Sequence, residues 1–241
     1  KLALRLLRGM RRDRRRDANS PPRVGVFMMH RDEQHLLPFF VHFYGTRFGY
    51  GNIHVFDNGS SPDLHDVLAR VEALGVSVDR SFDTAEDYER KGEIIEQAMN
   101  ARRSKYDITL PLDCDEFIGL ILPDGRYSCE TADLLDFFAT LSPGAYSTGQ
   151  RLRNDPRDLS RFYLWQGMHK IFFVKSRSRG LDVGSHDCTA PRRTTPTPLC
   201  YFELHNKPFD ILRAHALNKM ELRLDPEDRA ALDQYGGPGM H

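Results

Sequence analysis

Cysteine, long apolar runs and net charge are all scarce in this sequence, and each scarcity excludes a class of protein. The four cysteines among 241 residues form no Cys-x-x-Cys pair, so zinc-ribbon and thioredoxin-like sites lack support. Four cysteines in so long a chain do not require a disulfide framework, and a reducing, cytoplasmic location is expected. The longest apolar stretches are about six residues, far short of the roughly 18 that span a bilayer. The 34 basic and 34 acidic side chains cancel, which excludes nucleic-acid binding through overall positive charge.

The composition indicates a folded domain that follows a basic leader. Hydrophobic residues make up 40% of the chain and charged residues 28%, which is typical of a protein with a sizeable core. Residues 1–23 carry a net charge of +7, and the rest of the chain carries −7. We expect the leader, residues 1–22, to be either a flexible, solvated arm or a short amphipathic helix that contacts an anionic membrane surface. The chain begins with Lys1, so we expect residues to precede it, and a targeting signal could lie among them.

Strand-like and helical patterns alternate along the first half of the chain. Apolar runs of strand length occur at residues 24–29, 53–56, 76–78 and 108–112, and apolar residues at helical spacing lie between them. This order predicts an α/β fold with a central, mostly parallel sheet flanked by helices. Ligands bind such sheets beyond the carboxyl ends of the strands, so the turns after the second and fourth strands should meet at one edge. Further strands are expected at residues 145–152, 170–174 and 199–204.

Three carboxylates follow the fourth strand within four positions, in the run Asp113-Cys114-Asp115-Glu116. Like charges this close repel one another and raise each other's pKa values, so the run favours a cation between them. A divalent ion that prefers oxygen ligands, Mg2+ or Mn2+, fits this chemistry. The alternative is an acidic turn or helix cap, although apolar residues on both sides argue against full solvation.

Four motifs occur in a characteristic order: the strand of residues 24–29 ending in His30-Arg31-Asp32-Glu33, the helix with His42 and Tyr44, the turn Phe56-Asp57-Asn58-Gly59-Ser60-Ser61, and the run Leu112-Asp113-Cys114-Asp115-Glu116-Phe117. Together they resemble glycosyltransferases of the GT-A fold, especially the family 2 and family 92-like group. The resemblance implies a GT-A-like three-layer fold. In it, residues 23–120 are the nucleotide-sugar-binding half, residues 121–235 the acceptor-side half, and residues 236–241 a flexible tail. The first motif departs from the family's usual Lys-Asn-Glu, and Cys114 fills a variable position.

The resemblance also implies a nucleotide-sugar donor, expected to be a uridine diphosphate sugar, and a Mn2+ or Mg2+ ion that bridges its diphosphate. Carried over position by position, Asp113 and Asp115 become metal ligands. Asp57, with Asn58 beside it, becomes a contact to the base or ribose, and Arg31 a further contact to the donor. The chemistry agrees, because breaking the bond to the sugar places negative charge on the leaving diphosphate, which a divalent ion neutralises.

Cations and histidines elsewhere could complete such a site. Lys91 and Lys170 are candidates for phosphate contacts, and the alternative for each is a solvated surface lysine. His186 and His205 resemble the late histidines that supply a further metal ligand in this group, and neutral imidazole suits Mn2+. The alternative for either histidine is a structural role.

An inverting transfer also needs a carboxylate base that takes the proton from the acceptor hydroxyl. Asp155 and Asp187 are candidates, and the spacing favours neither. Tyr163, Trp165 and Met168 either border a sugar site or pack in the core.

The pattern therefore predicts a metal-dependent glycosyltransferase that moves a sugar from a nucleoside diphosphate sugar to a hydroxyl of a saccharide acceptor. One alternative is a metal-dependent nucleotidyltransferase or phosphodiesterase on a similar core, although the Gly-rich phosphate loop of such transferases is missing after the first strand. The other is a non-catalytic binding module. No nucleic-acid partner is expected, and any membrane contact is expected through the leader.

Overall fold

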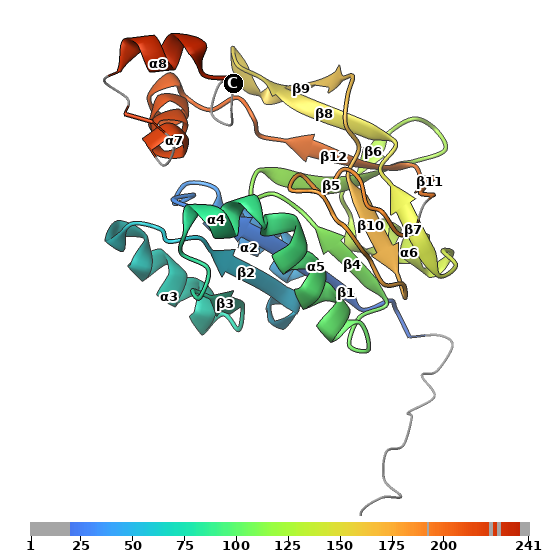
Figure 1. The fold of residues 1–241 in the computed structure, drawn as a ribbon. Helices are drawn as coiled ribbons and strands as arrows, with labels where there is room; N and C mark the ends of the chain where they lie inside the picture. Colours follow the sequence, from blue (N-terminus) through green and yellow to red (C-terminus); the bar gives the residue numbers. More distant parts are fainter. Residues whose placement is uncertain (1–19, 192, 222–223, 226–227, 237–241) are drawn as a thin grey trace, which may run out of the picture.

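The computed structural model describes residues 20–191, 193–221, 224–225 and 228–236, so nearly all of the predicted leader and tail lies outside the described residues. These residues form two sheets with helices packed around them (Figure 1). Within the described part of the chain, no helix is both long enough and apolar enough to cross a membrane.

The central sheet has seven strands in the order β11-β7-β10-β4-β1-β2-β3. They are β1 (Val24–His30), β2 (Ile53–Asp57), β3 (Ser77–Asp79), β4 (Ile108–Pro111), β7 (Gly144–Ser147), β10 (Ile171–Val174) and β11 (Thr195–Pro196). The four strands from β3 to β4 are parallel, β10 runs antiparallel to both of its neighbours, and β11 is parallel to β7. The prediction of an α/β fold with a central, mostly parallel sheet is confirmed.

Helices cover both faces of this sheet and so create three layers. One face packs against α2 (Leu37–Phe48), α3 (His65–Ala73) and α6 (Thr131–Ala139). The other packs against α5 (Lys91–Arg102), which follows the short α4 (Ala85–Glu89). Every position of β1, β2 and β4 is buried, which explains why these strands are continuous apolar runs in the sequence. Pro38 lies in the first turn of α2, where a helix needs no backbone N–H.

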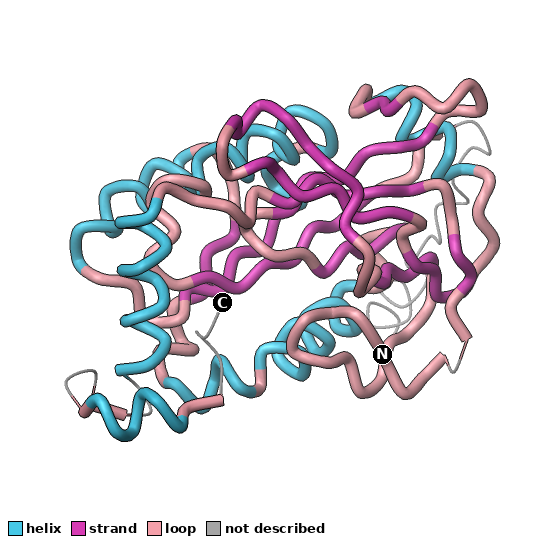
Figure 2. Tube along the Cα trace, turned by 90° about the horizontal axis from the view of Figure 1, so that it is seen from above, coloured by secondary structure: helices cyan, strands magenta, loops and turns pink. Residues whose placement is uncertain are grey.

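The second sheet has five strands in the order β6-β5-β12-β8-β9. They are β5 (Glu116–Ile121), β6 (Tyr127–Ser128), β8 (Gln150–Asp155), β9 (Asp158–Trp165) and β12 (Leu199–Glu203). Two helices, α7 (Phe209–Glu221) and α8 (Arg229–Gln234), follow β12 and form one end of the molecule (Figure 2).

The prediction of a single strand over residues 145–152 is wrong, because the chain changes sheets there. β7 belongs to the central sheet and β8 to the second sheet. Between them, Gly149 passes so close to Thr197 that a Cβ on the glycine would lie 2.4 Å from the Thr197 carbonyl oxygen. A residue with a side chain could not pass Thr197 this closely without a shift of the backbone. Glycine at position 149 therefore allows the chain to leave the central sheet after β7 and enter the second sheet at β8.

A buried histidine in β2 makes the stability of the fold depend on pH. The His54 ring is stacked on Phe27 and lies 2.7 Å from the Tyr106 hydroxyl. Burial lowers the pKa of His54 to about 4 from its ordinary 6.5. The unfolded chain therefore takes up a proton between these values that the folded protein does not, and the free energy of unfolding falls as the pH drops through 6.5 toward 4.

We expect this histidine to contribute about 2 kcal/mol of the stability lost between about pH 7.5 and pH 5. Urea unfolding at both pH values measures the loss. In His54→Phe the decline should be smaller by that amount, whereas an equal decline in both proteins would show that His54 is not the titrating group.

Candidate active site

The acidic run lies where the chain crosses from the central sheet into the second sheet. β4 ends just before it, and β5 begins at its last residue, Glu116. The turn is closed by a hydrogen bond of 3.1 Å from the Glu116 N–H to the Asp113 carbonyl. The Tyr44 hydroxyl, from α2, donates to the Glu116 carbonyl and accepts the Ile118 N–H. Since β1, β2 and β4 are parallel, their carboxyl ends meet at one edge, and this turn lies there.

Asp113 is paired with two buried lysines. Lys91, in the first turn of α5, donates to Oδ1, and Lys170, just before β10, donates to Oδ2 at 2.6 Å. Lys170 also lies 3.0 Å from Glu116 Oε2 and donates to the Gly184 carbonyl at 2.6 Å. Burial alone would raise the pKa of Asp113, but the two ammonium groups hold it well below its usual range. The structure thus brings together both lysines and the first acid of the run.

Glu116, which Lys170 also contacts, has a pKa shifted in the opposite direction from that of Asp113. Burial raises the pKa of Glu116 to about 8; Lys170 opposes this rise, and the neighbouring carboxylates Asp113 and Asp115 add to it. Its Oε2 accepts the Asp113 N–H at 2.8 Å. The lysine cluster, defined as Lys91, Asp113, Glu116 and Lys170, therefore brings two ammonium groups to Asp113, and burial favours the protonated form of Glu116. Ammonium groups at this turn favour an anionic ligand nearby.

Asp115 belongs to a different group, together with Glu203 and His205. One possible ligand atom from each lies within 4.8 Å of the others. Among the described residues, no side chain donates a hydrogen bond to the Asp115 carboxylate, in contrast to the two lysines bound to Asp113. Burial, together with the nearby Asp113 carboxylate, raises the pKa of Asp115 to about 6. Two carboxylates and an imidazole are a donor set that suits Mn2+ or Mg2+, and a cation would relieve the repulsion between these acids. The residues present fit such an ion.

Glu203, a member of this group, was missed in the sequence analysis. It is the last residue of β12, and its carboxylate accepts two hydrogen bonds from Arg151, of 2.5 and 2.8 Å, and one of 3.0 Å from Arg153. Burial would raise the pKa of Glu203, but the hydrogen bonds from Arg151 and Arg153 lower it. The signal that could have found it is its spacing from His205, because residues two apart on an extended chain point the same way.

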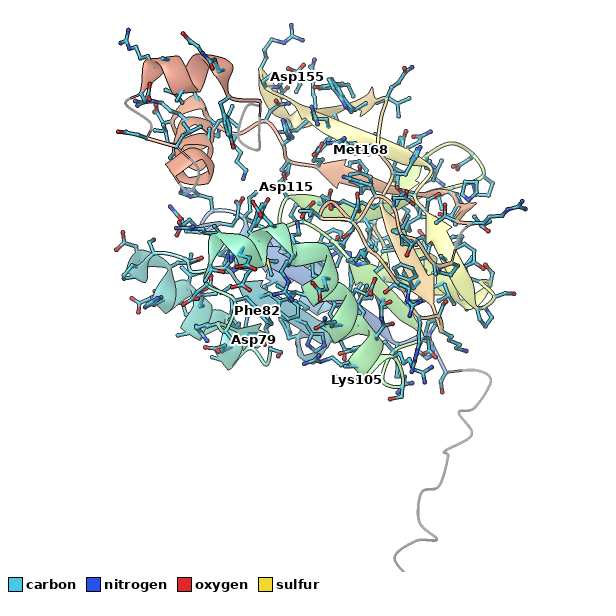
Figure 3. All side chains as sticks on the ribbon, in the orientation of Figure 1. Asp79, Phe82, Lys105, Asp115, Asp155 and Met168 are labelled. Atoms are coloured by element: carbon cyan, nitrogen blue, oxygen red, sulfur yellow. The ribbon has the colours of Figure 1, made fainter. Side chains whose placement is uncertain are left out.

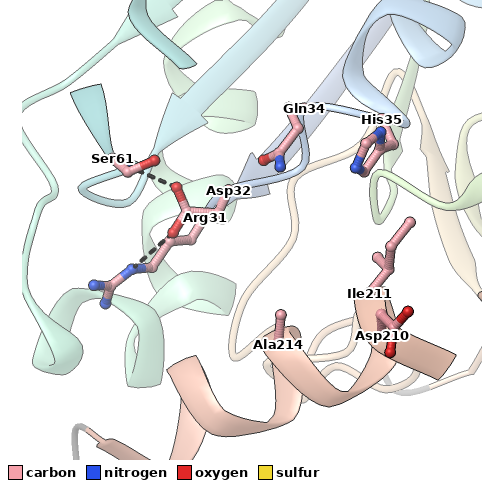
Figure 4. Close-up of a pocket in the computed structure, with 8 residues that line it drawn as sticks. All are labelled: Arg31, Asp32, Gln34, His35, Ser61, Asp210, Ile211 and Ala214. Carbon is pink, nitrogen blue, oxygen red and sulfur yellow. Dashed lines mark hydrogen bonds and ion pairs between the residues drawn. The ribbon is translucent and has the colours of Figure 1, made fainter. Parts of the chain in front are cut away.

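A cavity of about 430 Å³ opens at the same edge of the central sheet (Figure 4). The loop after β1, the loop after β2 and α7 supply its lining: Arg31, Asp32, Gln34, His35, Ser61, Asp210, Ile211 and Ala214. The two loops are tied together because the Ser61 N–H donates to the Asp32 carboxylate at 2.7 Å. The volume lies within the range of small-molecule sites, and Arg31 is the predicted donor contact that lines it.

Asp57, the last residue of β2, and Asn58, the first residue of the following loop, are both buried. The Asn58 amide donates to the Phe82 and Thr84 carbonyls at 2.9 and 2.8 Å. The Asp57 carboxylate accepts the Ser60 N–H at 3.3 Å and lies 3.9 Å from His30 Nε2. Both side chains therefore shape the loop after β2, and their contact with a nucleotide stays a prediction.

Three other predicted residues are not members of the Asp115 group. Asp155 is at the turn between β8 and β9, where its carboxylate accepts the Arg157 N–H at 2.9 Å (Figure 3). Asp187 is exposed and accepts the Cys188 N–H at 2.7 Å. His186 Nδ1 lies 3.0 Å from the His169 carbonyl, and burial lowers its pKa. Roles for these three in catalysis or metal binding stay predictions.

The comparisons with known proteins are distant. No protein-family model matches the chain, and no curated protein is significantly similar to it in sequence. Among solved structures, it is similar to a mannosyltransferase from Pyrobaculum calidifontis in complex with GDP-Man and Mn2+, with 15% identity, a TM-score of 0.46, and coverage of 86% of this chain and 64% of that one.

Two further solved structures are similar at the same level. A cytidylyltransferase from Leptospira borgpetersenii has 16% identity and a TM-score of 0.35 over 64% of this chain and 61% of that one. A mycobacterial protein has 14% identity and a TM-score of 0.44 over 80% of this chain and 70% of that one. The chain spans less than two thirds of the mannosyltransferase and of the cytidylyltransferase. Likenesses this distant do not transfer a substrate or an activity to this chain.

Proposed function

We propose that this protein is a divalent-cation-dependent glycosyltransferase of the GT-A kind, which transfers a sugar from a nucleoside diphosphate sugar to a hydroxyl of a saccharide. The observation that carries the proposal is the pairing of two groups in one turn. Asp113 lies in the lysine cluster, where it is bound by two ammonium groups, and Asp115 lies beside two further side chains that could hold a metal ion. A donor diphosphate and its cation need both kinds of group.

Each group has a distinct part in this proposal. Asp115 and His205 would hold the ion, with Glu203 as a third ligand kept in place by its arginines. When bound, the ion neutralises charge on the departing diphosphate. The lysine cluster fixes the turn through Asp113 and places positive charge near the phosphates. The cavity beside Arg31 is large enough for the nucleoside.

The proton from the acceptor needs a base, and Asp155 and Asp187 are the proposed candidates. Asp187 lies in the same loop as Gly184, whose carbonyl binds Lys170, so it is the first to test. Asp155 is held at the tip of the β8–β9 hairpin by Arg157.

The proposal is tested by incubating the protein with Mn2+ and a panel of donors, namely UDP-glucose, UDP-galactose, UDP-N-acetylglucosamine and GDP-mannose. We expect slow release of the nucleoside diphosphate from one donor, UDP-linked in the first instance, and loss of that release in EDTA. Release of pyrophosphate from a nucleoside triphosphate in a parallel assay would instead identify a nucleotidyltransferase. If the protein neither binds nor turns over any of these donors or nucleoside triphosphates, both the glycosyltransferase and the nucleotidyltransferase are contradicted.

A further inference from the structure

Four large side chains are exposed on β9 and just after it, and Leu164 is the one that points to the opposite face from Tyr163 and Trp165. Tyr163 is 37% exposed and Trp165 is 41% exposed. Met168, which lies in the loop toward β10 (Figure 3), is 58% exposed. The Tyr163 and Trp165 rings meet edge to face, with 6.0 Å between their centroids. β9 is also the edge strand of the five-stranded sheet. An aromatic pair on an exposed edge invites association, so its presence calls for a functional explanation.

Strand pairing connects these rings to the candidate active site. Tyr163 is paired with Arg153, Arg153 with Glu203, and Glu203 with Glu116. Directly opposite residues in neighbouring strands point to the same face, so this row runs across one face from the lysine cluster to the edge. The side chains of Glu203 and Arg153 are 7% and 12% exposed, so the row opens to solvent at Tyr163.

Side-chain contacts confirm that the rings and the Asp115 group share this face. The Arg153 guanidinium carbon lies 4.2 Å from the centroid of the Trp165 ring, while Arg153 Nε donates to Glu203 at 3.0 Å. A single guanidinium therefore separates the Trp165 ring from a member of the candidate metal group, and its cation–π contact holds the ring. The Tyr201 hydroxyl donates to the Met168 carbonyl at 2.9 Å and anchors the loop that leads from Trp165 to Lys170.

We infer that Tyr163 and Trp165 form an acceptor subsite, in which they pack against a sugar ring of the saccharide that receives the transferred sugar; this rests on the proposed function. A pyranose ring presents a C–H face bordered by hydroxyls. Tyr163 and Trp165 offer flat apolar faces with an O–H and an N–H at their rims, and both are rigid, so little entropy is lost on binding. A saccharide suits this surface because the row from Tyr163 to Glu203 is polar and leads into the Asp115 group.

The chain contains a single tryptophan, so Trp165 itself reports on the subsite. Its fluorescence emission, and its protection from quenching by acrylamide, would be followed during titration with cellohexaose, maltohexaose, mannohexaose and chitohexaose. Each titration is done with and without UDP and Mn2+. We expect at least one oligosaccharide to shift the emission and protect the ring. In Tyr163→Ala the affinity should fall about tenfold, the size of effect that one aromatic contact supports.

Leu164→Ala is the matched control, because Leu164 is 58% exposed on the same strand but points to the opposite face. This variant should keep its affinity within about twofold of the wild type. Equal weakening in both variants, or no response of Trp165 to any oligosaccharide in either condition, would overturn the subsite. So would an emission shift that depends on protein concentration alone, which would identify a second copy of the chain as the occupant. Titrations without UDP and Mn2+ need no donor turnover, so they can succeed where the proposed function fails.

Discussion

Asp115→Asn is expected to lower turnover of the donor sugar about a thousandfold, because the substitution removes the one acid of the turn that is free to bind the cation. The fold should persist. The raised pKa of Asp115 means that its ionised form is disfavoured in the folded protein, so the neutral amide should leave the free energy of unfolding unchanged or higher above about pH 6. Initial rates of nucleoside diphosphate release at saturating Mn2+ measure the first effect, and urea unfolding measures the second.

Asp124→Asn is the matched control for this prediction. Asp124 is an exposed aspartate in the turn between β5 and β6, where it pairs with Arg126, far along the strand from the candidate site. Its turnover should equal that of the wild type. Activity of Asp115→Asn within about tenfold of the wild type would remove the proposed cation ligand.

Lys170→Met is expected to lower the free energy of unfolding by about 3 kcal/mol, because it removes one of the two buried ammonium partners of Asp113 and the ammonium group that lies beside Glu116. Lys170 is 2% exposed and lies within 3.0 Å of both Asp113 and Glu116. Methionine fills the same volume, so the loss would come from charge and hydrogen bonding rather than from a cavity. Urea unfolding at neutral pH is the measurement.

Two further variants separate this effect from general damage. Lys175→Met removes an exposed lysine that lies 3.8 Å from Asp107, and it should cost less than about 1 kcal/mol. The double variant Lys170→Met/Asp113→Asn should recover part of the lost stability, since the carboxylate that has lost one of its two ammonium partners is also removed. Losses in the double variant that simply add would show that Lys170 and Asp113 are not coupled.

The central sheet could be predicted from the sequence because its inner strands are buried on both faces. β1, β2 and β4 therefore stand out as continuous apolar runs. In the second sheet, β12 was expected as a strand at residues 199–204, but β9 could not be predicted in this way. β9 lies at its edge and mixes exposed and half-buried residues, and its Trp165 carries no periodic signal that distinguishes a strand from a loop. The change of sheet at Gly149 depends on contact with a segment almost fifty residues away along the chain.

Some parts of the candidate site could likewise be predicted from the sequence, and others could not. The acids of the turn after β4 are visible in the sequence as charges that follow an apolar run. The sequence does not show that Asp113 pairs with lysines while Asp115 does not. Lys91 and Lys170 are 22 and 57 residues from Asp113 along the chain, and only the folded chain brings them to it. Likewise His205 was a candidate from its motif, whereas its grouping with Asp115 depends on the pairing of β12 with β5.

The most direct test of the central claim is the binding of Mn2+ itself, followed by the electron paramagnetic resonance signal of the free ion. In the presence of UDP, the wild type should remove one equivalent of Mn2+ from solution, and Asp115→Asn and His205→Ala should each weaken this binding by more than about tenfold. Asp124→Asn should bind as the wild type does. If the wild type leaves all of the Mn2+ free, or if Asp115→Asn binds it unchanged, the turn at residues 113–116 does not hold a catalytic cation.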